Sequence, residues 1–163
     1  MNGWDDPAED RLEEPRALAL VGAALGIDLG DRTIGLAVSD ALGLTAQGLP
    51  TLERHGGKVD LEALRVICAE REIQRVVVGL PRNMDGSEGP RAAKSRAFAR
   101  GLHEALSLPV FLWDERLTTA EAERLLIFAD VSRRKRAEVI DKLAAQLILQ
   151  GWLEAGRPEV DPA

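Results

Sequence analysis

Three acidic residues stand in apolar surroundings, and they are the side chains of this sequence best suited to chemistry. Asp28 interrupts the apolar run Leu25–Leu29, and Glu115 follows the apolar stretch Val110–Trp113. Asp141 lies within the last helical pattern of the chain. A carboxylate removed from water costs several kcal/mol unless a partner such as a cation compensates it. Either the strand that carries Asp28 is therefore exposed, or its carboxylate has such a partner.

The setting of Asp141 predicts an inward-facing carboxylate. Asp141, Ala145, Ile148 and Trp152 recur at steps of four, three and four residues, which places them on one stripe of a helix. Asp141 is the charged member of that stripe. Because the stripe is otherwise apolar, we expect it to face the core.

The position of Glu115, taken with the other two acids, favours a metal-dependent reaction. Glu115, or its neighbour Asp114, lies at the carboxyl end of a predicted strand, where open α/β sheets place their ligands. Carboxylates that converge from three elements repel one another unless a divalent cation neutralises them. Mg²⁺ suits an all-oxygen site, and two such ions can clamp the attacking and leaving oxygens of a phosphodiester. The expected chemistry is hydrolysis by metal-activated water.

Alternating strands and helices must position these acids. The predicted strands are Leu25–Leu29, Thr33–Ser39, Ala46–Leu52, Arg75–Gly79 and Val110–Trp113. The predicted helices are Lys58–Glu72, Pro90–Leu106, Thr118–Ala129 and Val139–Leu153. A tight Gly30-Asp31 turn joins the first two strands as a hairpin. Meandering strands followed by strand and helix alternation predict an α/β mixed sheet covered by helices.

The chain of 163 residues predicts one domain at residues 23–153, between two charged ends. Residues 1–22 are expected to be a disordered acidic leader, and residues 154–163 a flexible acidic tail. The net charge of -6 resides in these ends, because residues 17–153 carry 18 basic and 18 acidic side chains. A nucleic-acid partner is therefore not excluded by the overall charge.

Two clusters of basic residues are candidates for phosphate binding. The run 133–136 reads Arg-Arg-Lys-Arg, and a second series comprises Arg91, Lys94, Arg96 and Arg100. A local basic patch binds phosphate whatever the global charge, while a solvated helix face is an equal alternative for the second series.

The sequence also predicts where the protein resides. The single Cys68 excludes an intramolecular disulfide, and the acidic N-terminus is unlike a signal or transit peptide. No apolar run approaches the roughly 20 residues that a membrane span needs. We therefore expect a cytoplasmic protein that does not enter a membrane.

Four segments together resemble the motifs of the YqgF or RuvX family. They read GIDLGDRTIGLAVSD (26–40), VVGLPRNMDGSEGP (77–90), DERLTTAEA (114–122) and SRRKRAEVIDKLAAQLILQGWL (132–153). The resemblance runs in the expected order over roughly residues 23–153. It implies an RNase H-like fold, a five-stranded mixed sheet with helices on both faces, the first three strands antiparallel and the later ones parallel. It also implies that Asp28, Glu115 and Asp141 are the catalytic acids and the ligands of Mg²⁺ or Mn²⁺.

The same resemblance implies further site residues. The expected substrate contacts are Arg82, Asn83, Arg116, Arg133, Arg134, Lys135 and Lys142. For Arg116 and Lys142 the alternative is simple compensation of a neighbouring acid. Gly30 and Gly35 either let a phosphate or metal approach the backbone or serve turn and packing. The loop that carries Asn83, Asp85, Ser87 and Glu88 is expected to be a mobile flap over the substrate.

Several other residues are assigned to the core or to the surface. Trp113 is expected in the core and not as a base-stacking platform, and Cys68 lies on the apolar face of a helix. His55 and His103 lack partners at metal-ligand spacing and are expected at the surface.

These observations predict a metal-dependent nuclease acting in the maturation of precursor small-subunit rRNA. The first alternative is a Holliday junction resolvase acting on branched DNA, for which a symmetric homodimer is expected; whether the chain dimerises stays open. The second is a non-catalytic nucleic-acid-binding module, disfavoured by retention of all three acids. An actin-like ATPase or sugar kinase shares the Asp-Leu-Gly turn but needs two such domains, and 163 residues supply one.

Overall fold

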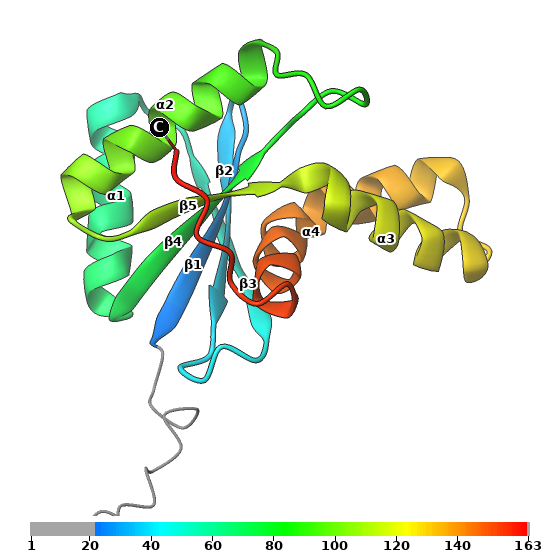
Figure 1. Cartoon of the computed structure of the whole chain (residues 1–163), viewed down its shortest axis with the longest axis horizontal. Coiled ribbons are helices and arrows are strands. Elements are labelled where there is room, and N and C mark those ends of the chain that lie inside the picture. The colour runs from blue at the N-terminus through cyan, green and yellow to red at the C-terminus, as the bar shows by residue number, and fades with distance from the viewer. Residues whose placement is uncertain (1–21, 163) are drawn as a thin grey trace, which may run out of the picture.

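A five-stranded sheet forms the centre of the molecule, and helices cover both of its faces (Figure 1). The computed structural model describes residues 22–162, apart from the side chains of residues 119 and 120. The strands are β1 (Ala23–Leu29), β2 (Thr33–Ser39), β3 (Ala46–Glu53), β4 (Ile73–Leu80) and β5 (Val110–Asp114). The helices are α1 (Gly57–Glu70), α2 (Pro90–Leu106), α3 (Glu115–Phe128) and α4 (Arg133–Glu154).

The strands are ordered β3-β2-β1-β4-β5 across the sheet. The pairs β1–β2 and β2–β3 are antiparallel, whereas β1–β4 and β4–β5 are parallel. This arrangement confirms the mixed sheet expected of an RNase H-like fold. Because β1, β4 and β5 run in the same direction, their carboxyl ends meet at one edge of the sheet.

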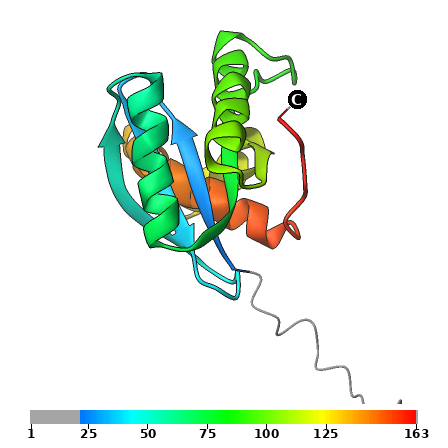
Figure 2. The same cartoon turned by 90° about the vertical axis from the view of Figure 1, so that its left-hand side faces the viewer.

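Each face of the sheet has its own apolar cluster. Helices α1 and α2 lie on one face and α4 lies on the other (Figure 2). Leu25 and Ile27 of β1 belong to the cluster under α1 and α2. Ala24 belongs to the cluster under α4, which also contains Ala145 and Ile148. Because strand side chains alternate between faces, Asp28 falls on the α4 face, with Ala24 and Gly26.

The α4 face of the sheet is lined by small residues, which bring the helix close. A Cβ built on Gly26 would lie 2.7 Å from the Leu149 Cβ and 3.1 Å from the Ala145 carbonyl oxygen. A Cβ built on Gly35 would lie 3.3 Å from the Asp28 Cβ and 3.5 Å from the Ala145 Cβ. The close approach of α4 therefore depends on missing side chains in the strands beneath it.

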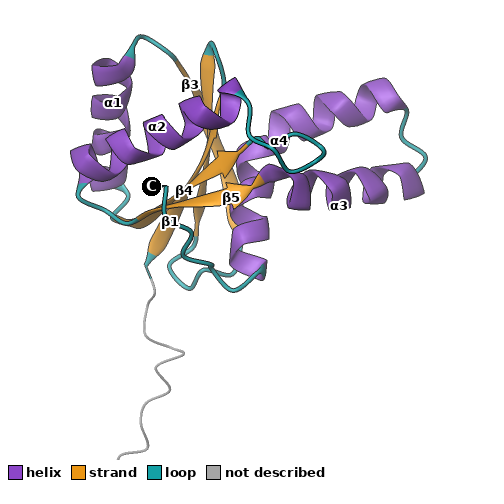
Figure 3. Cartoon of the chain, turned by 45° about the horizontal axis from the view of Figure 1, so that its top comes forward, coloured by secondary structure: helices purple, strands orange, loops and turns teal. Residues whose placement is uncertain are grey.

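Two helices begin earlier than the sequence predicts. Helix α3 begins at Glu115 and not at Thr118, because the Asp114 side chain caps it by accepting a hydrogen bond from the Arg116 backbone N–H at 3.0 Å. Helix α4 begins at Arg133 because the Ser132 hydroxyl accepts from the Lys135 N–H at 3.3 Å. The basic run is thus the opening turn of α4. Together α3 and the first half of α4 form a hairpin that extends away from the sheet (Figures 1 and 3).

The C-terminal segment, for which flexibility was expected, makes defined contacts with the sheet. The Leu112 N–H of β5 donates to the Val160 carbonyl at 2.9 Å, and Trp152 Nε1 donates to the Pro158 carbonyl at 2.9 Å. The segment therefore covers the open edge of β5, which would otherwise expose unpaired backbone groups. The leader expected at residues 1–22 lies outside the described residues, except for its last position.

No helix in the described part of the chain is long and apolar enough to cross a membrane.

The packing of α4 predicts the effect of adding one methyl group to β1. We expect Gly26→Ala to lower the free energy of unfolding by about 1–3 kcal/mol, because the new Cβ overlaps the helix side chain and backbone. Gly48→Ala is the matched control, since its Cβ would meet only the Gln146 Oε1 at 3.6 Å. Urea denaturation of both variants and the wild type measures the difference. Equal losses in the two variants would contradict the account of this contact.

Candidate active site

Asp28 lies at the end of β1, between the sheet and α4. It pairs in register with Gly35 of β2, whose missing side chain leaves room for the Asp28 side chain and for Ala145 of α4. Asp28 is half-buried and lines an open cavity of about 300 Å³ together with Gly35, Asp141 and Lys142. The apolar run therefore carries Asp28 to the edge of the core, where its carboxylate faces a cavity.

Glu115 reaches over the same edge from the neighbouring side. It is the first residue of α3 and follows directly on β5. A Cβ built on Gly79 of β4 would lie 2.5 Å from the Glu115 Oε1, so the carboxylate occupies space that a side chain on β4 would fill. The half-buried Glu115 thus projects toward β1 across the end of β4.

Asp141 lies at the solvent end of the predicted α4 stripe. Ala145, Ile148 and Trp152 are buried, as the helical spacing predicts, whereas Asp141 is exposed. The predicted stripe is therefore confirmed for its apolar members, whereas the prediction of an inward-facing Asp141 is wrong, because this residue is exposed. Half of α4 lies beyond the sheet, and Asp141 falls where the helix leaves it.

One open cavity of about 410 Å³ brings the three acids together. Its lining includes Asp28, Glu115, Asp141, Arg91, Glu123 and Arg133. Among residues 22–162, however, no group of three or more acidic, histidine or cysteine side chains is arranged to hold a metal ion. The carboxylates share a cavity and have the oxygen donors that Mg²⁺ prefers, but they do not close around one point.

Burial and mutual repulsion raise the pKa values of two of these acids. Burial raises the pKa of Asp28, and the nearby Asp141 raises it further, while Arg91 acts in the opposite direction. Burial raises the pKa of Glu115 to about 7, with contributions from Asp28 and Asp114, again opposed by Arg91. Such shifts mark carboxylates that are partly withdrawn from water and lie close to one another.

Arg91 is a site residue that sequence reasoning missed. It was visible only as a member of a basic series, yet it lies on the first turn of α2 and lines all three cavities around the carboxylates. Arg96 and Arg100 of the same series contact the C-terminal segment instead, and Lys94 is exposed. The available signal was Pro90, which starts a helix and so places Arg91 at the sheet edge.

Glu123 is a second missed residue. It lies eight residues after Glu115, a little over two helical turns along α3, and both side chains line the same two cavities. The Glu123 carboxylate lies 3.8 Å from Arg136 Nε, and Arg136 also donates to the Val131 carbonyl at 2.7 Å. Glu123 and Arg136 thus brace the α3–α4 hairpin at the margin of the site.

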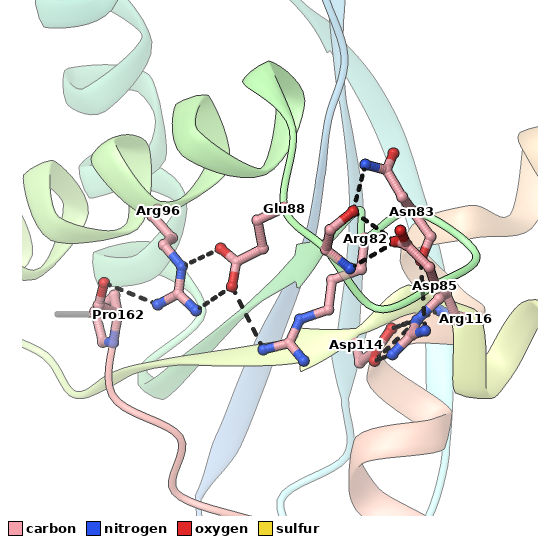
Figure 4. A network of polar contacts seen from close by, with 9 residues as sticks. Arg82, Asn83, Asp85, Glu88, Arg96, Asp114, Arg116 and Pro162 are labelled. Atoms are coloured by element: carbon pink, nitrogen blue, oxygen red, sulfur yellow. Dashed lines mark hydrogen bonds and ion pairs between the residues drawn. The ribbon is translucent and has the colours of Figure 1, made fainter.

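The predicted flap is held by a network of ion pairs and hydrogen bonds (Figure 4). Glu88 bridges Arg82 at 3.5 Å and Arg96 at 2.5 Å. Arg96 also donates to the Pro162 carbonyl at 3.5 Å, which connects the flap to the C-terminal segment. The Ser87 hydroxyl donates to Asp85 at 2.5 Å and accepts from Asn83 Nδ2 at 3.0 Å. The loop is therefore ordered by its own side chains, as well as by α2.

Arg116 ties the flap to the end of β5. It forms an ion pair with Asp114 at 2.7 Å and donates to the carbonyls of Asn83 and Met84 at 3.4 Å. This arrangement fits the predicted alternative in which Arg116 compensates a neighbouring acid. The Asp114 pKa is lowered, since the hydrogen bonds and charge of Arg116 outweigh the burial that would raise it.

The other predicted phosphate contacts divide into two groups. Arg133 and Lys142 line cavities that contain Asp28 and Asp141. Arg134 and Lys135 lie farther out and pair loosely with Glu138, at 3.6 and 3.7 Å. Exposed pairs of this kind contribute little to stability, so these two side chains can turn to another partner at small cost.

The predicted core and surface assignments agree with the structure. Trp113 is 9% exposed, and its Nε1 donates to the Thr118 hydroxyl at 2.7 Å. Cys68 is buried, and burial raises the pKa of its thiol to about 11. His55 and His103 are exposed. Gly30 lies in the β1–β2 turn, where its N–H donates to the Thr33 carbonyl at 2.9 Å, so turn geometry explains it.

The raised pKa of Glu115 predicts a pH dependence of stability in metal-free buffer. Because the folded-state pKa is about 7 against an ordinary value of 4.5, the folded protein keeps a proton that the unfolded chain releases between these pH values. The free energy of unfolding should therefore fall from pH 4.5 to pH 7 by up to about 3 kcal/mol more in the wild type than in Glu115→Gln.

Urea unfolding at the two pH values, with EDTA present, measures this difference. Glu104→Gln, an exposed acid on α2, serves as control and should keep the wild-type slope. An identical pH slope in the wild type and Glu115→Gln would show that Glu115 titrates as an ordinary surface carboxylate.

Comparison with known proteins adds a family match to this geometry. Residues 22–155 match the family model described as "RuvX: Holliday junction resolvase". A protein of Myxococcus xanthus is 60% identical over 134 residues, covering 82% of this chain and 89% of that relative. A protein of Halothermothrix orenii is 54% identical over 129 residues, covering 79% and 92%. Both relatives carry the name "Putative pre-16S rRNA nuclease".

A solved structure supports the fold. The chain is similar to Thermus thermophilus RuvC, solved in complex with a Holliday junction substrate, with a TM-score of 0.50 and 15% sequence identity. The alignment covers 84% of this chain and 98% of RuvC. At this identity the similarity shows a shared RuvC-like, RNase H-type fold and nothing about the substrate.

Proposed function

The chain belongs to the RuvX family, and on that premise we propose that it is a metal-dependent nuclease that matures the precursor of small-subunit rRNA. The observation that carries the proposal is the cavity where Asp28, Glu115 and Asp141 meet from β1, α3 and α4. The names of the relatives point to the RNA substrate. A nuclease of this kind acts in the cytoplasm, and an unpaired Cys68 fits a compartment that keeps thiols reduced.

Asp28, Glu115 and Asp141 are the proposed ligands of Mg²⁺ or Mn²⁺. Their oxygens suit a hard divalent cation, and a cation would favour the charged forms of Asp28 and Glu115, which burial disfavours. Asp141 is exposed on α4, so its side chain has the freedom to turn toward the other two. When bound, the metal supplies an activated water and stabilises charge on the phosphate.

The chain's own cations would bind and orient the phosphodiester. Arg91 and Lys142 flank Asp28 on two sides of the cavity, and Arg133 approaches from the start of α4. Hydrolysis joins a water oxygen to phosphorus and breaks the bond from phosphorus to the leaving sugar oxygen. Arg91 is best placed to hold a non-bridging phosphate oxygen, because it faces the carboxylates in every cavity around them.

A Holliday junction resolvase is the second candidate. The description of the family model favours it. It requires two active sites related by symmetry, and a homodimer would supply them. A non-catalytic binding module fits less well, because a pure binder gains nothing from acids whose pKa values are raised beside a phosphate site.

The substrate is tested by offering several nucleic acids side by side. Precursor rRNA fragments, unstructured RNA, unstructured DNA and a four-way DNA junction are incubated at equal concentration with Mg²⁺ or Mn²⁺. We expect cleavage of RNA at defined positions. Symmetric paired nicks in the junction with RNA untouched would overturn the RNA proposal in favour of the resolvase.

Each proposed metal ligand has a nearly isosteric neutral variant. Asp28→Asn, Glu115→Gln and Asp141→Asn should each lower the cleavage rate by about 10³-fold or more, because an essential ligand is lost. The metal-free proteins should be as stable as the wild type or more stable, since each change removes repulsion in the cavity. Thermal melts should show stabilisation by Mn²⁺ in the wild type that shrinks in the variants.

The matched control for these variants is Glu104→Gln, which should cleave at the wild-type rate. Full activity in any one of the three variants would remove that residue from the site.

Arg91 has a separable role. Arg91→Gln should lower kcat by about 10²-fold, because one charged donor to the phosphate is lost beside the carboxylates. Arg91→Lys should recover part of the lost kcat, because lysine keeps the positive charge but lacks the several planar N–H donors of the guanidinium. Lys94→Gln, one turn further along α2 and exposed, is the matched control. An unchanged kcat in Arg91→Gln would show that Arg91 only offsets the charge of the acids.

A further inference from the structure

The tip of the α3–α4 hairpin carries an aromatic ring that the fold does not use. Phe128, the last residue of α3, is 93% exposed, and its neighbours Leu125 and Ile127 are 65% and 54% exposed. The chain's other phenylalanines, Phe98 and Phe111, pack against the two apolar clusters. Burying a phenylalanine side chain would contribute about 1.5–3 kcal/mol to stability, and Phe128 does not make this contribution. Its exposed ring therefore indicates a role other than stabilising the fold.

The ring lies beside the basic opening turn of α4. Four residues separate Phe128 from Arg133, and backbone hydrogen bonds hold this turn. The Val131 N–H donates to the Leu126 carbonyl at 3.0 Å, and Arg136 Nη1 donates to the Val131 carbonyl at 2.7 Å. An exposed aromatic ring at the end of α3 is thus joined by a short, hydrogen-bonded turn to the start of α4, where the side chains of Arg133, Arg134 and Lys135 are exposed.

We propose that Phe128 and the basic turn 133–135 form a binding site for single-stranded nucleic acid, with an unpaired base stacked on the ring. This inference rests on the proposed nuclease function and extends the substrate contact from Arg133, which lines the catalytic cavity, to the tip of the hairpin. A base has a flat apolar face that stacks on an aromatic side chain, while its phosphates pair with arginine and lysine. Phenylalanine has no polar group, so the stacking would tolerate any base.

The hairpin also fixes the spacing of the two contacts. Glu115 begins α3 and Phe128 ends it, so 13 helical steps separate the catalytic end from the tip, or about 20 Å. A stacked strand advances roughly 3.4 Å per nucleotide, which places the stacked base about six nucleotides from the scissile bond. The tip would therefore select substrates with an unpaired stretch on one side of the cleavage site.

A second copy of this chain is a less favourable occupant. Across a two-fold axis the basic turns of both copies would meet, and like charges repel. A stable dimer also buries about 800 Å² per partner, which three apolar side chains at a narrow tip do not provide. The charge of the tip instead complements a polyanion.

The test measures binding without cleavage, which separates it from the proposed nuclease function. A single-stranded RNA that carries 2-aminopurine at successive positions is titrated with full-length protein in EDTA. Phe128→Ala should weaken affinity by about tenfold to a hundredfold, and Phe128→Trp should restore it. Leu125→Ala removes an exposed apolar side chain without a planar face and should bind as the wild type does.

Two signals locate the contact. The fluorescence of 2-aminopurine should be quenched at one position by the wild type and not by Phe128→Ala. In cleavage reactions, shortening the RNA on one side below about six nucleotides from the cut should reproduce the loss seen with Phe128→Ala. Because Phe128 is exposed, its variants should melt at the wild-type temperature, which confirms that they are folded.

Three outcomes would overturn the inference. Affinity of Phe128→Ala equal to that of the wild type would remove the stacking contact, even if the protein proves to be a nuclease. Equal loss in Leu125→Ala and Phe128→Ala, with a concentration-dependent change in sedimentation, would identify the tip as a contact between copies. Weaker binding to duplex and single strand alike would show a general contact and not a site for an unpaired base. If no cleavage is found but Phe128→Ala still loses quenching, the nuclease proposal fails and this site stands.

Discussion

The contact between α4 and the small residues of the sheet determines where every proposed catalytic group lies. A Cβ on Gly26 would overlap Leu149 of α4, and a Cβ on Gly35 would lie 3.3 Å from the Asp28 Cβ and 3.5 Å from the Ala145 Cβ. Because these contacts hold α4 close to the sheet, Asp141 of α4 lies near the carboxyl end of β1. The missing side chain of Gly79 likewise leaves space above β4, and the Glu115 carboxylate occupies that space. Absent side chains in three strands thus define the cavity.

This packing places Asp28 and Glu115, which are half-buried, close to other acids, and the resulting repulsion is unfavourable. Burial and neighbouring charge raise the pKa values of Asp28 and Glu115, and Arg91 offsets the effect only in part. A protein selected for stability alone would place neutral residues here, since a buried uncompensated charge costs more than a hydrogen bond returns. The conflict between folding and charge at one edge of the sheet is typical of a functional site.

The sequence predicts the strands and singles out the acids because these follow from local pattern, whereas the directions of the strands follow from the family resemblance. Asp28 breaks an apolar run, and Asp141 breaks an apolar stripe, so each is visible as an anomaly without knowledge of the fold. Arg91 and Glu123 are not anomalous, because arginine and glutamate on helices are ordinary surface residues. Their role depends on which way a helix turns after the sheet brings it to the cavity, and this is a tertiary property.

The helix starts and the C-terminal segment show the same limit. Helices α3 and α4 begin several residues before the positions that the hydrophobic pattern predicts. Each start is set by one capping hydrogen bond, at Asp114 or Ser132, which the pattern does not reveal. The path of residues 155–162 depends on the open edge of β5 and on Arg96 and Arg100, which are distant in sequence. Long-range partners of this kind leave no periodic trace in the chain.

The central claim is that Asp28, Glu115 and Asp141, which line one cavity, bind a divalent metal. Anomalous scattering from crystals soaked with Mn²⁺ tests it most directly, because manganese is located without reference to activity. We expect a peak in the cavity bonded to Asp28 and to Glu115 or Asp141, with the Asp141 side chain turned inward, and no peak in crystals of Asp28→Asn. A cavity without manganese, or a peak that persists in Asp28→Asn, would contradict the claim.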